Sequence, residues 1–535
     1  MSPDDCTTLP QLLATTVARV GDQPALGAIR HGQLSWRTWV EVDTDVRRLA
    51  GGLRRAGVGK GDRVVQFAPN SYEWILTDLA VLALGAVHVP LHHSLSALQA
   101  AELLDRSAAK LLVVADRGDL PQFDPAFPVG GDATYDQLMD GPPESAATEL
   151  HPEDLATILF TSGTTGQPQG VMLSHRNLVT NAIATTAAVG GGPDETRLCF
   201  LPLSHIYART CDLYSWLYRG TRLVLAESRE TIVRDCQAAR PTVLNGVPYF
   251  YQKIAQQVQA AGQTGKQGAI QSLLGGNLKR CFCGGAAVAP EVEALFREQG
   301  LPLLSGYGLT EASPVVSATS LENYRPGTVG QPLANLEVQL AADGEILVRG
   351  PSVMLGYWQD TAATEAAIVD GWLRTGDLGE RDAEGNLRIV GRKKELLVLS
   401  TGKNVSPVRV EQLLASSRLV EYACVVGEGR SCLAALIVPN PDALRAEIRR
   451  RRLWVWSKRR AVSHPAIRAL YRAEIDRLLQ AASREEQVGP FALLPRGFSI
   501  ERGELTPKLS LRRRQIGANF AGLIERMYHS RRARR

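Results

Sequence analysis

Helix-like and strand-like segments alternate along the first 115 residues, and this alternation limits the folds open to the chain. An apolar stripe repeats at helical spacing over residues 39–56, at Val42, Val46, Leu49 and Leu53. Strand-like apolar runs lie at 63–69, 87–91 and 111–114. The helical segments between them begin near residue 72 and cover 97–106. Because strands that alternate with helices form parallel, helix-covered sheets, the sequence predicts an α/β fold.

The pattern changes in the second half of the chain. From about residue 321, short alternating runs and turn signals predict an antiparallel, barrel-like subdomain; the turns are Asp343-Gly344, Asp370-Gly371 and Glu384-Gly385. After 391–407, ACVVGE and CLAALIVPN read as strands of a small α+β domain, followed by charged helices. We therefore expect a large N-terminal domain over 1–393 and a small, mobile C-terminal domain over 394–535, while 117–150 reads as loops.

Cysteine usage and the N-terminus predict a cytoplasmic protein. The eight cysteines are scattered, and the CxC pair Cys281 and Cys283 lacks zinc-ligand spacing, so they read as small buried hydrophobes. The start, MSPDDCTTLP, lacks the basic and apolar regions of a secretory signal. The apolar segment 75–91 is interrupted by Asp78 and His88, so it is too short to span a bilayer.

A phosphate-binding loop is the strongest local signal. FTSGTTGQPQG at 160–170 follows the strand-like ATILF, and its glycines and hydroxyls predict a loop between a strand and a helix. Glycine permits positive φ, so successive backbone N–H groups can converge on an anion. Charge-assisted hydrogen bonds contribute roughly 1.5–3 kcal/mol each, so the loop could hold a polyphosphate without a lysine.

This string and three others, in order, resemble the adenylate-forming acyl-CoA synthetases. Residues 161–170 match the family pattern TSGTTGxPKG except at Gln169. YGLTE at 307–311, TGD at 375–377 and GRKKE at 391–395 match further family motifs. VPYFYQKI at 247–254 is similar to the long-chain fatty acid–CoA ligase subgroup. The resemblance covers almost the whole chain.

The resemblance implies a site for ATP and Mg²⁺. Phosphates would be held by the loop residues Thr161, Ser162, Gly163, Thr164, Thr165 and Gly166. The adenine pocket would be formed by Gly284, Gly285, Ala286, Tyr307 and Gly308. Asp377 and Arg392 would bind the ribose, and Thr310 would touch the α-phosphate. Glu311 and Thr165 would hold Mg²⁺ through hard oxygen ligands.

The resemblance also implies a two-step reaction with a fatty acid and coenzyme A. His205, Val247 and Tyr249 would border the acyl pocket, with His205 near the entry of the carboxylate. The C-terminal domain would rotate about Lys394 between the steps, bringing Gly402 to the CoA channel. As isolated residues, His205 and Tyr307 would read as structural, and Glu311 as a solvated acid.

Two family lysines are replaced. Gln169 stands in the loop, and Ser510 stands at the position of the second lysine in ELTPKLSLRRR. Lys508 could supply the displaced charge as a catalytic residue, or it could be an ordinary surface lysine. Two alternatives to the CoA ligase stay open: an acyl-AMP ligase that loads a carrier protein, and, because the two lysines are replaced, a nucleotide- and acyl-binding homologue with impaired catalysis.

A basic stretch lies near the C-terminus. LRAEIRRRRLWVWSKRRA at 444–461 contains eight Arg or Lys residues, one acid, and the tryptophans Trp454 and Trp456. It reads as a solvated helix face, as a contact with an anionic membrane, or as a site that attracts CoA phosphates. A formal net charge of +5 and the lack of a reader motif argue against nucleic acid as a partner.

Overall fold

Two sheets covered by helices form the large domain of the computed structural model, which describes residues 2–114, 132–144, 148–162, 168–480, 482–499, 501–505 and 511–532. Within these residues one sheet has seven strands, in the order β18-β8-β7-β4-β3-β5-β6. Its strands are β3 (Arg63–Phe67), β4 (Val87–Leu91), β5 (Leu111–Val114), β6 (Asp132–Thr134), β7 (Leu155–Ser162), β8 (Pro168–Ser174) and β18 (Gly356–Tyr357). The helices of this part are α2 (Trp39–Arg55), α3 (Tyr72–Ala83), α4 (Ala97–Ser107), α5 (Tyr135–Met139) and α6 (His175–Val189).

The second sheet of the described chain has nine strands, in the order β15-β14-β13-β12-β11-β9-β10-β1-β2. They are β1 (Pro24–Arg30), β2 (Gln33–Thr38), β9 (Thr196–Cys199), β10 (Arg222–Leu225), β11 (Val243–Gly246), β12 (Arg280–Cys283), β13 (Leu303–Gly308), β14 (Val315–Ala318) and β15 (Gln331–Pro332). The helical elements here are η1 (Pro3–Asp5), α1 (Leu9–Val20), α7 (Ile206–Ala208), the π-helical turn η3 (Arg209–Tyr214), α8 (Ser215–Arg219), α9 (Ile232–Ala239), α10 (Pro248–Ala260), α11 (Ala269–Leu273), α12 (Pro290–Glu298) and η4 (Thr310–Ala312).

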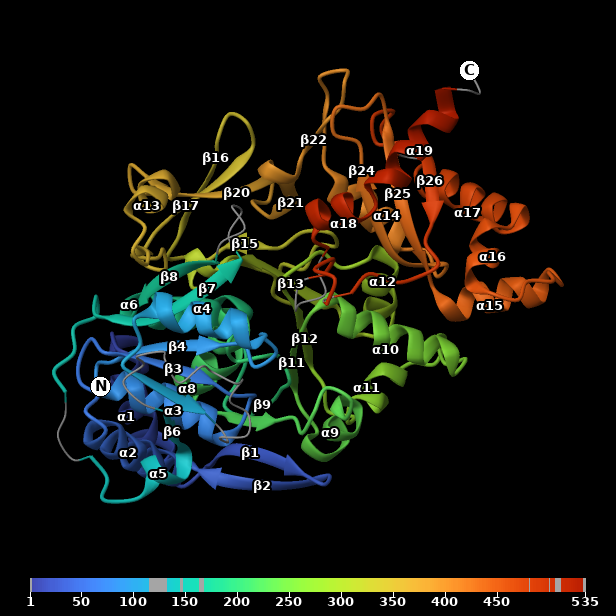
Figure 1. The fold of residues 1–535 in the computed structure, drawn as a ribbon. Coiled ribbons are helices and arrows are strands. Elements are labelled where there is room, and N and C mark those ends of the chain that lie inside the picture. The colour runs from blue at the N-terminus through green and yellow to red at the C-terminus, as the bar shows by residue number, and fades with distance from the viewer. Residues whose placement is uncertain are drawn as a thin grey trace.

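A smaller antiparallel sheet and the C-terminal domain complete the fold (Figure 1). The sheet contains β16 (Glu337–Leu340), β17 (Glu345–Arg349), β19 (Ile368–Val369), β20 (Trp372–Arg381) and β21 (Leu387–Arg392), with α13 (Thr361–Ala367) beside it. The C-terminal domain contains η5 (Lys393–Glu395), β22 (Leu397–Val398), β23 (Asn404–Val405), α14 (Pro407–Ala415), β24 (Val420–Val426), β25 (Leu433–Pro439), α15 (Pro441–Arg450), α16 (Lys458–Ser463), α17 (Pro465–Leu478), β26 (Val488–Leu493), α18 (Arg513–Asn519) and α19 (Ala521–Arg532).

The parallel pairing predicted from the alternation is confirmed. β3 pairs in parallel with β4 and with β5, and β9 to β13 form a second parallel run. The predicted helix at 39–56 is α2, whose N-cap Thr38 forms a capping box with Glu41. The predicted loop region 117–150 is corrected, because its described part contains β6 and α5.

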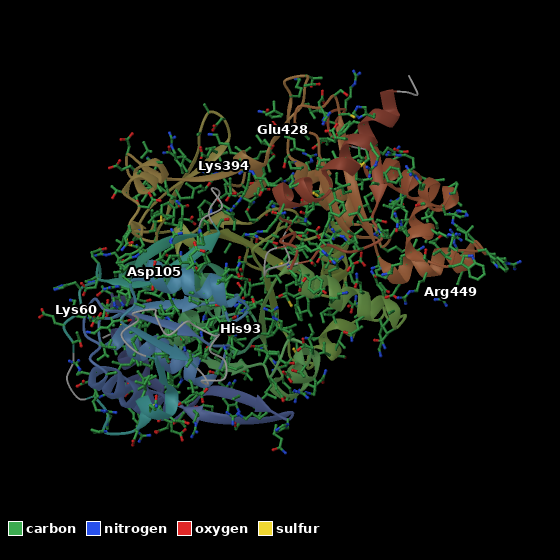
Figure 2. All side chains as sticks on the ribbon, in the orientation of Figure 1. Lys60, His93, Asp105, Lys394, Glu428 and Arg449 are labelled. Atoms are coloured by element: carbon green, nitrogen blue, oxygen red, sulfur yellow. The ribbon has the colours of Figure 1, made fainter. Side chains whose placement is uncertain are left out.

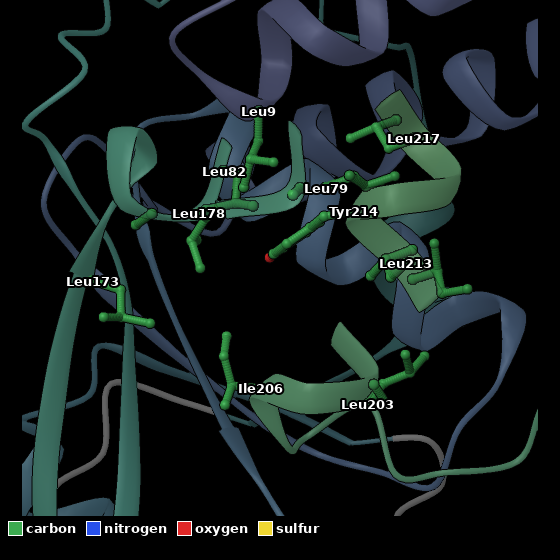
Figure 3. Close-up of a cluster of buried hydrophobic side chains, with 14 of the residues drawn as sticks. Leu9, Leu79, Leu82, Leu173, Leu178, Leu203, Ile206, Leu213, Tyr214 and Leu217 are labelled. Carbon is green, nitrogen blue, oxygen red and sulfur yellow. The ribbon is translucent and has the colours of Figure 1, made fainter. Parts of the chain in front are cut away.

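The large domain contains an extensive cluster of buried hydrophobic side chains. Leucine side chains from α1, α3, β8, α6 and the 203–217 segment converge around Tyr214 (Figure 3). The segment that carries His205 is therefore fixed to the core on its C-terminal side, at Ile206 and Leu213. No helix in the described ranges combines the length and the apolar character needed to cross a bilayer.

Candidate functional site

The predicted phosphate loop lies at the tip of a β-hairpin, not between a strand and a helix. β7 and β8 pair antiparallel, with Thr161 opposite Gln169 and Ser162 opposite Pro168. The sequence prediction placed a helix after the loop and missed β8, in which Val171 and Leu173 are buried strand residues. Helix α6 begins only after Ser174, whose side chain caps it. Gly163, Thr164, Thr165 and Gly166 lie outside the described residues.

A buried carboxylate joins three elements, β20, β13 and β21. Asp377 on β20 is 4% exposed, and its Oδ2 accepts a hydrogen bond of 2.8 Å from the Tyr307 hydroxyl at the end of β13. Arg392 on β21 donates from Nε to Asp377 Oδ1, also at 2.8 Å. Burial, and then the charge of Asp377, raise the pKa of Tyr307 well above its usual range. The structure thus brings together three residues that the resemblance assigned to adenosine.

Glu311 is tied to the same hairpin. It lies on η4 with Thr310, directly after the strand that carries Tyr307 and Gly308. Its Oε1 accepts a 3.0 Å hydrogen bond from the hydroxyl of Tyr357, and Tyr357 pairs with Val171 of β8. Burial, and then Glu311, raise the pKa of Tyr357 above its usual range. The other carboxylate oxygen, Oε2, makes no hydrogen bond to a described residue.

These side chains fit the groups that Mg²⁺ and ATP present. A carboxylate with an oxygen to spare suits Mg²⁺, which binds few protein oxygens and otherwise phosphates and water. Asp377 offers a buried carboxylate, already oriented by two donors, of the kind that accepts hydrogen bonds from a diol. Glu311 and Asp377 come from different elements, and Tyr307, which precedes Glu311 and binds Asp377, links them, so their arrangement is a property of the fold.

The glycines after β12 form a wall against the segment of His205. An added Cβ at Gly284 would lie 2.9 Å from the ring of Tyr207, and Gly285 has φ +83°. The Tyr207 hydroxyl donates to the carbonyl oxygen of Gly246 at 3.5 Å. His205 caps α7, with Nδ1 accepting from the backbone N–H of Tyr207 at 3.2 Å. Sequence reasoning missed Tyr207, although it stands two residues after the histidine.

The two other residues assigned to the acyl pocket, Val247 and Tyr249, differ in their exposure. Val247 is half-buried, caps α10 and packs against the core. Tyr249 is 46% exposed on α10, with the Lys253 ammonium 5.4 Å from its ring centroid. The ring of Tyr249 is therefore at the surface of this structure.

A buried carboxyl group lies beside Tyr207. Asp212, on η3, accepts a 2.6 Å hydrogen bond from Asn245 at Oδ1, while Oδ2 has no hydrogen-bond partner in the described part of the chain. Burial raises the pKa of Asp212 from its usual 3.8 to about 6, against the opposing effect of Arg197. π-Helical turns occur often at functional sites. No local sequence pattern marks this aspartate.

An Asp212→Asn variant should be more stable than the parent at pH 8, by about 3 kcal/mol. Because the pKa of Asp212 is higher in the folded than in the unfolded chain, the parent loses stability as the pH rises through about 6. The difference should shrink to under about 1 kcal/mol near pH 4, where the folded parent is neutral like the variant. Urea unfolding across this pH range measures it, with the exposed Asp194→Asn as the matched control. A parent that is equally stable at both pH values contradicts the prediction.

The connection between the domains is anchored on one side. Lys393 forms ion pairs with Asp343 at 2.5 Å and with Glu345 at 3.1 Å, both on the antiparallel sheet. Lys394 follows on η5, at the junction of the two domains (Figure 2). Gly402 lies in the turn between β22 and β23 with φ +77°, and no atom lies within 4 Å of an added Cβ there.

The predicted catalytic lysine and its neighbour lie outside the described residues. On either side of Lys508 and Ser510, Leu505 and Leu511 form an antiparallel bridge. Arg513, just beyond, donates from a terminal guanidinium nitrogen to Glu411 Oε2 at 2.7 Å. The cysteines are confirmed as free and buried, except for Cys432, which is partly exposed.

The fold and this site define a two-domain nucleotide-binding enzyme, and comparison with known families identifies it further. The family model of the AMP-binding enzymes matches residues 13–358, and that of the AMP-binding enzyme C-terminal domain matches 394–532. The chain therefore belongs to the AMP-binding enzyme family, which confirms the resemblance and the expectation of an enzyme.

Similar proteins include named CoA ligases. The long-chain fatty acid–CoA ligase FadD15 of Mycobacterium bovis is 32% identical over 565 residues, covering 92% of each chain. The peroxisomal long chain acyl-CoA synthetase 7 of Arabidopsis thaliana is 29% identical, covering 93% of this chain and 82% of its own. The o-succinylbenzoate CoA synthetase of Bacillus subtilis, solved with its acyl-adenylate intermediate, superimposes with a TM-score of 0.76 at 23% identity, covering 95% of this chain and 98% of its own. The same enzyme was solved with ATP and magnesium, and it supports the fold.

Proposed function

We propose that the protein is an ATP- and Mg²⁺-dependent fatty acid–CoA ligase. The observation that carries the proposal is the binding of Asp377 by Tyr307 and Arg392. Glu311, which follows Tyr307 on η4, is linked through Tyr357 to β8, the strand after the TSGTTG loop. Relatives named as long-chain fatty acid–CoA ligases, at up to 32% identity over most of the chain, support the substrate class.

In the first step, an oxygen of the fatty acid carboxylate attacks the α-phosphorus of ATP, and pyrophosphate leaves. Tyr307 and the wall at Gly284 would hold the adenine, and Asp377 and Arg392 the ribose. Thr310 would contact the α-phosphate, and the loop from Thr161 would hold the outgoing phosphates. When bound at Glu311, Mg²⁺ would neutralise charge on the phosphates.

In the second step, the thiol of coenzyme A attacks the acyl carbon, loses its proton, and AMP leaves. The domains 1–393 and 394–535 would rotate about Lys394, whose neighbour Lys393 stays fixed to Asp343 and Glu345. A hinge beside a fixed anchor lets the C-terminal domain turn a different surface toward the active site in each step. Gly402 would then lie along the CoA channel.

Pyrophosphate release with a panel of straight-chain carboxylic acids tests the proposal. We expect release only with medium- or long-chain acids, and conversion to the acyl-CoA when free CoA is added. Acyl-adenylate that accumulates in the presence of CoA would favour the ligase that loads a carrier protein. No release with any acid would favour the binding homologue.

A matched pair of variants links this activity to the site. Asp377→Asn should raise KM for ATP, because one charge-assisted hydrogen bond to the ribose is lost. The loss corresponds to a factor of about 10 to about 150. Glu337→Gln, an exposed acid on β16 of the same sheet, should leave KM unchanged.

A further inference from the structure

Two tryptophans are exposed at the surface of the C-terminal domain. The tryptophan turn, residues 451–457, connects α15 to α16. Trp454 is 85% exposed and Trp456 74%, and their rings meet edge to face with centroids 5.2 Å apart. Exposing two rings of this size is unfavourable for a chain that is surrounded only by water.

The exposure of the tryptophans is built into the local structure. Leu453 and Val455 alternate with them and pack against the core of the C-terminal domain. In an extended segment, alternate side chains point to opposite sides, so anchoring Leu453 and Val455 directs both tryptophans outward. The turn therefore presents its larger apolar side chains to the surroundings and buries its smaller ones.

Several basic residues that flank the tryptophans in the sequence form no ion pair within the described ranges. Five exposed basic residues make no ion pair with any residue in the described ranges: Arg449, Arg452, Lys458, Arg459 and Arg460. The one acid of 444–461, Glu447, is already shared by Arg450 and Arg451. Figure 2 shows Arg449 at the outer edge of the C-terminal domain, away from Lys394.

The placement of three of these cations is unfavourable for folding. Helix α16 begins with Lys458, Arg459 and Arg460, and its first turn has no acidic residue. Positive charge at a helix N-terminus opposes the helix dipole. These three cations therefore do not stabilise the N-terminus of the helix that carries them.

We propose that the tryptophan turn docks the protein on an anionic phospholipid bilayer. Trp454 and Trp456 enter the headgroup layer, where aromatic rings with one polar edge are favoured, and the five cations contact lipid phosphates. A single-stranded nucleic acid would need a basic groove lined with stacking rings. Here the rings pack on each other at a projecting turn instead (Figure 1).

Vesicle co-sedimentation of the full chain tests the proposal. We expect the protein to bind vesicles of phosphatidylcholine mixed with phosphatidylglycerol, and not vesicles of phosphatidylcholine alone. Added salt should weaken the binding, because salt screens the cations. Intrinsic fluorescence should shift to the blue on binding, as exposed tryptophans leave water. None of these readouts needs catalysis, so failure of the proposed ligase activity would leave the result intact.

Matched variants distinguish what the tryptophans and the charges contribute to vesicle binding from the general effects of a substitution. Trp454→Ala with Trp456→Ala should lower the partition coefficient about a hundredfold, roughly tenfold for each ring. Arg449→Gln with Arg459→Gln should lower it about 25-fold, roughly fivefold for each charge. The apolar control is Leu98→Ala, at a residue 85% exposed on α4, and the charge control is Lys266→Gln with Lys279→Gln.

Three results would overturn the proposal. The first is no binding, or equal binding to both kinds of vesicle. The second is unchanged binding by the double tryptophan variant, with its thermal stability intact. The third is binding of single-stranded RNA or DNA in place of vesicles, which would assign the turn to a nucleic acid. The controls are expected to bind like the parent.

Discussion

Replacing Lys508 with alanine should slow formation of the acyl-adenylate about a thousandfold. The family pattern has a lysine at the position of Gln169 and another at that of Ser510, so Lys508 is the lysine left in ELTPKLSLRRR. An ammonium group about 4 Å from a phosphate contributes roughly 4 kcal/mol at an effective dielectric of 20. Losing this interaction from the transition state corresponds to a factor of about a thousand in rate.

The arginines that follow Lys508 can be tested as competitors for this role. Arg513 is held by Glu411 at 2.7 Å, so its guanidinium is already engaged. Arg512 and Arg514 are exposed. Arg514→Gln changes the charge by the same amount as Lys508→Ala, and we expect it to leave the rate of adenylation near that of the parent.

Single-turnover release of pyrophosphate, measured at saturating ATP and fatty acid, checks the expected loss. The affinity for ATP should change little, because the loop N–H groups and Asp377 remain in place. Moving the lysine, in the double variant Lys508→Ala with Ser510→Lys, should restore most of the rate. A Lys508→Ala variant with normal adenylation would show that the charge comes from elsewhere in the chain.

Local periodicity explains which parts of the fold could be predicted. The stripe in 39–56 and the apolar run at 63–69 match α2 and β3. Apolar side chains of both elements pack into the same buried cluster, so their spacing in the sequence records which side is buried. Strand β8 was missed, because the glycines and hydroxyls before it predicted a loop that leads into a helix. The pairing of β8 with β7 across the loop defines this strand, and local periodicity does not record that pairing.

Motif residues were predicted, but their interactions were not. Asp377 and Arg392 were expected to bind the ribose, and the structure shows that they also bind each other across β20 and β21. Tyr207 and Asp212 carry no motif, and they became candidates only through their contacts with Gly246 and Asn245. Such contacts join distant segments, so a single sequence contains no signal for them.

The clearest example of this limit is a charge cluster in the core of the large domain. Asp78 and His88 appeared in the sequence as interruptions of an apolar segment. In the fold both are fully buried, and Arg209 of η3 binds them, contacting His88 Nδ1 at 2.9 Å. Asp78 and Arg209 lie 131 residues apart, and η3 also carries Asp212 and directly follows α7. The cluster therefore positions the candidate site.

An Arg209→Met variant should destabilise the large domain by about 3–5 kcal/mol at pH 8. Methionine preserves much of the packing, but the carboxylate of Asp78 is left buried with the Tyr214 hydroxyl, 3.0 Å away, as its main donor. Removing one partner of a buried ion pair leaves an uncompensated charge, and this accounts for the size of the effect. Urea unfolding measures the loss, and a loss under about 1 kcal/mol would contradict the role assigned to the pair.

The pH dependence of the variant identifies the cause of its instability. In the parent, burial and then the charge of Arg209 lower the pKa of His88 to about 4, so His88 is neutral at physiological pH. Without Arg209, His88 beside Asp78 can take up a proton, and its pKa in the folded state rises. A raised histidine pKa stabilises the folded state at low pH and loses this effect as the pH rises. The variant should therefore be least destabilised near pH 5.5, and Arg209→Met with Asp78→Asn, which removes both charges, should be more stable than the single variant at pH 8.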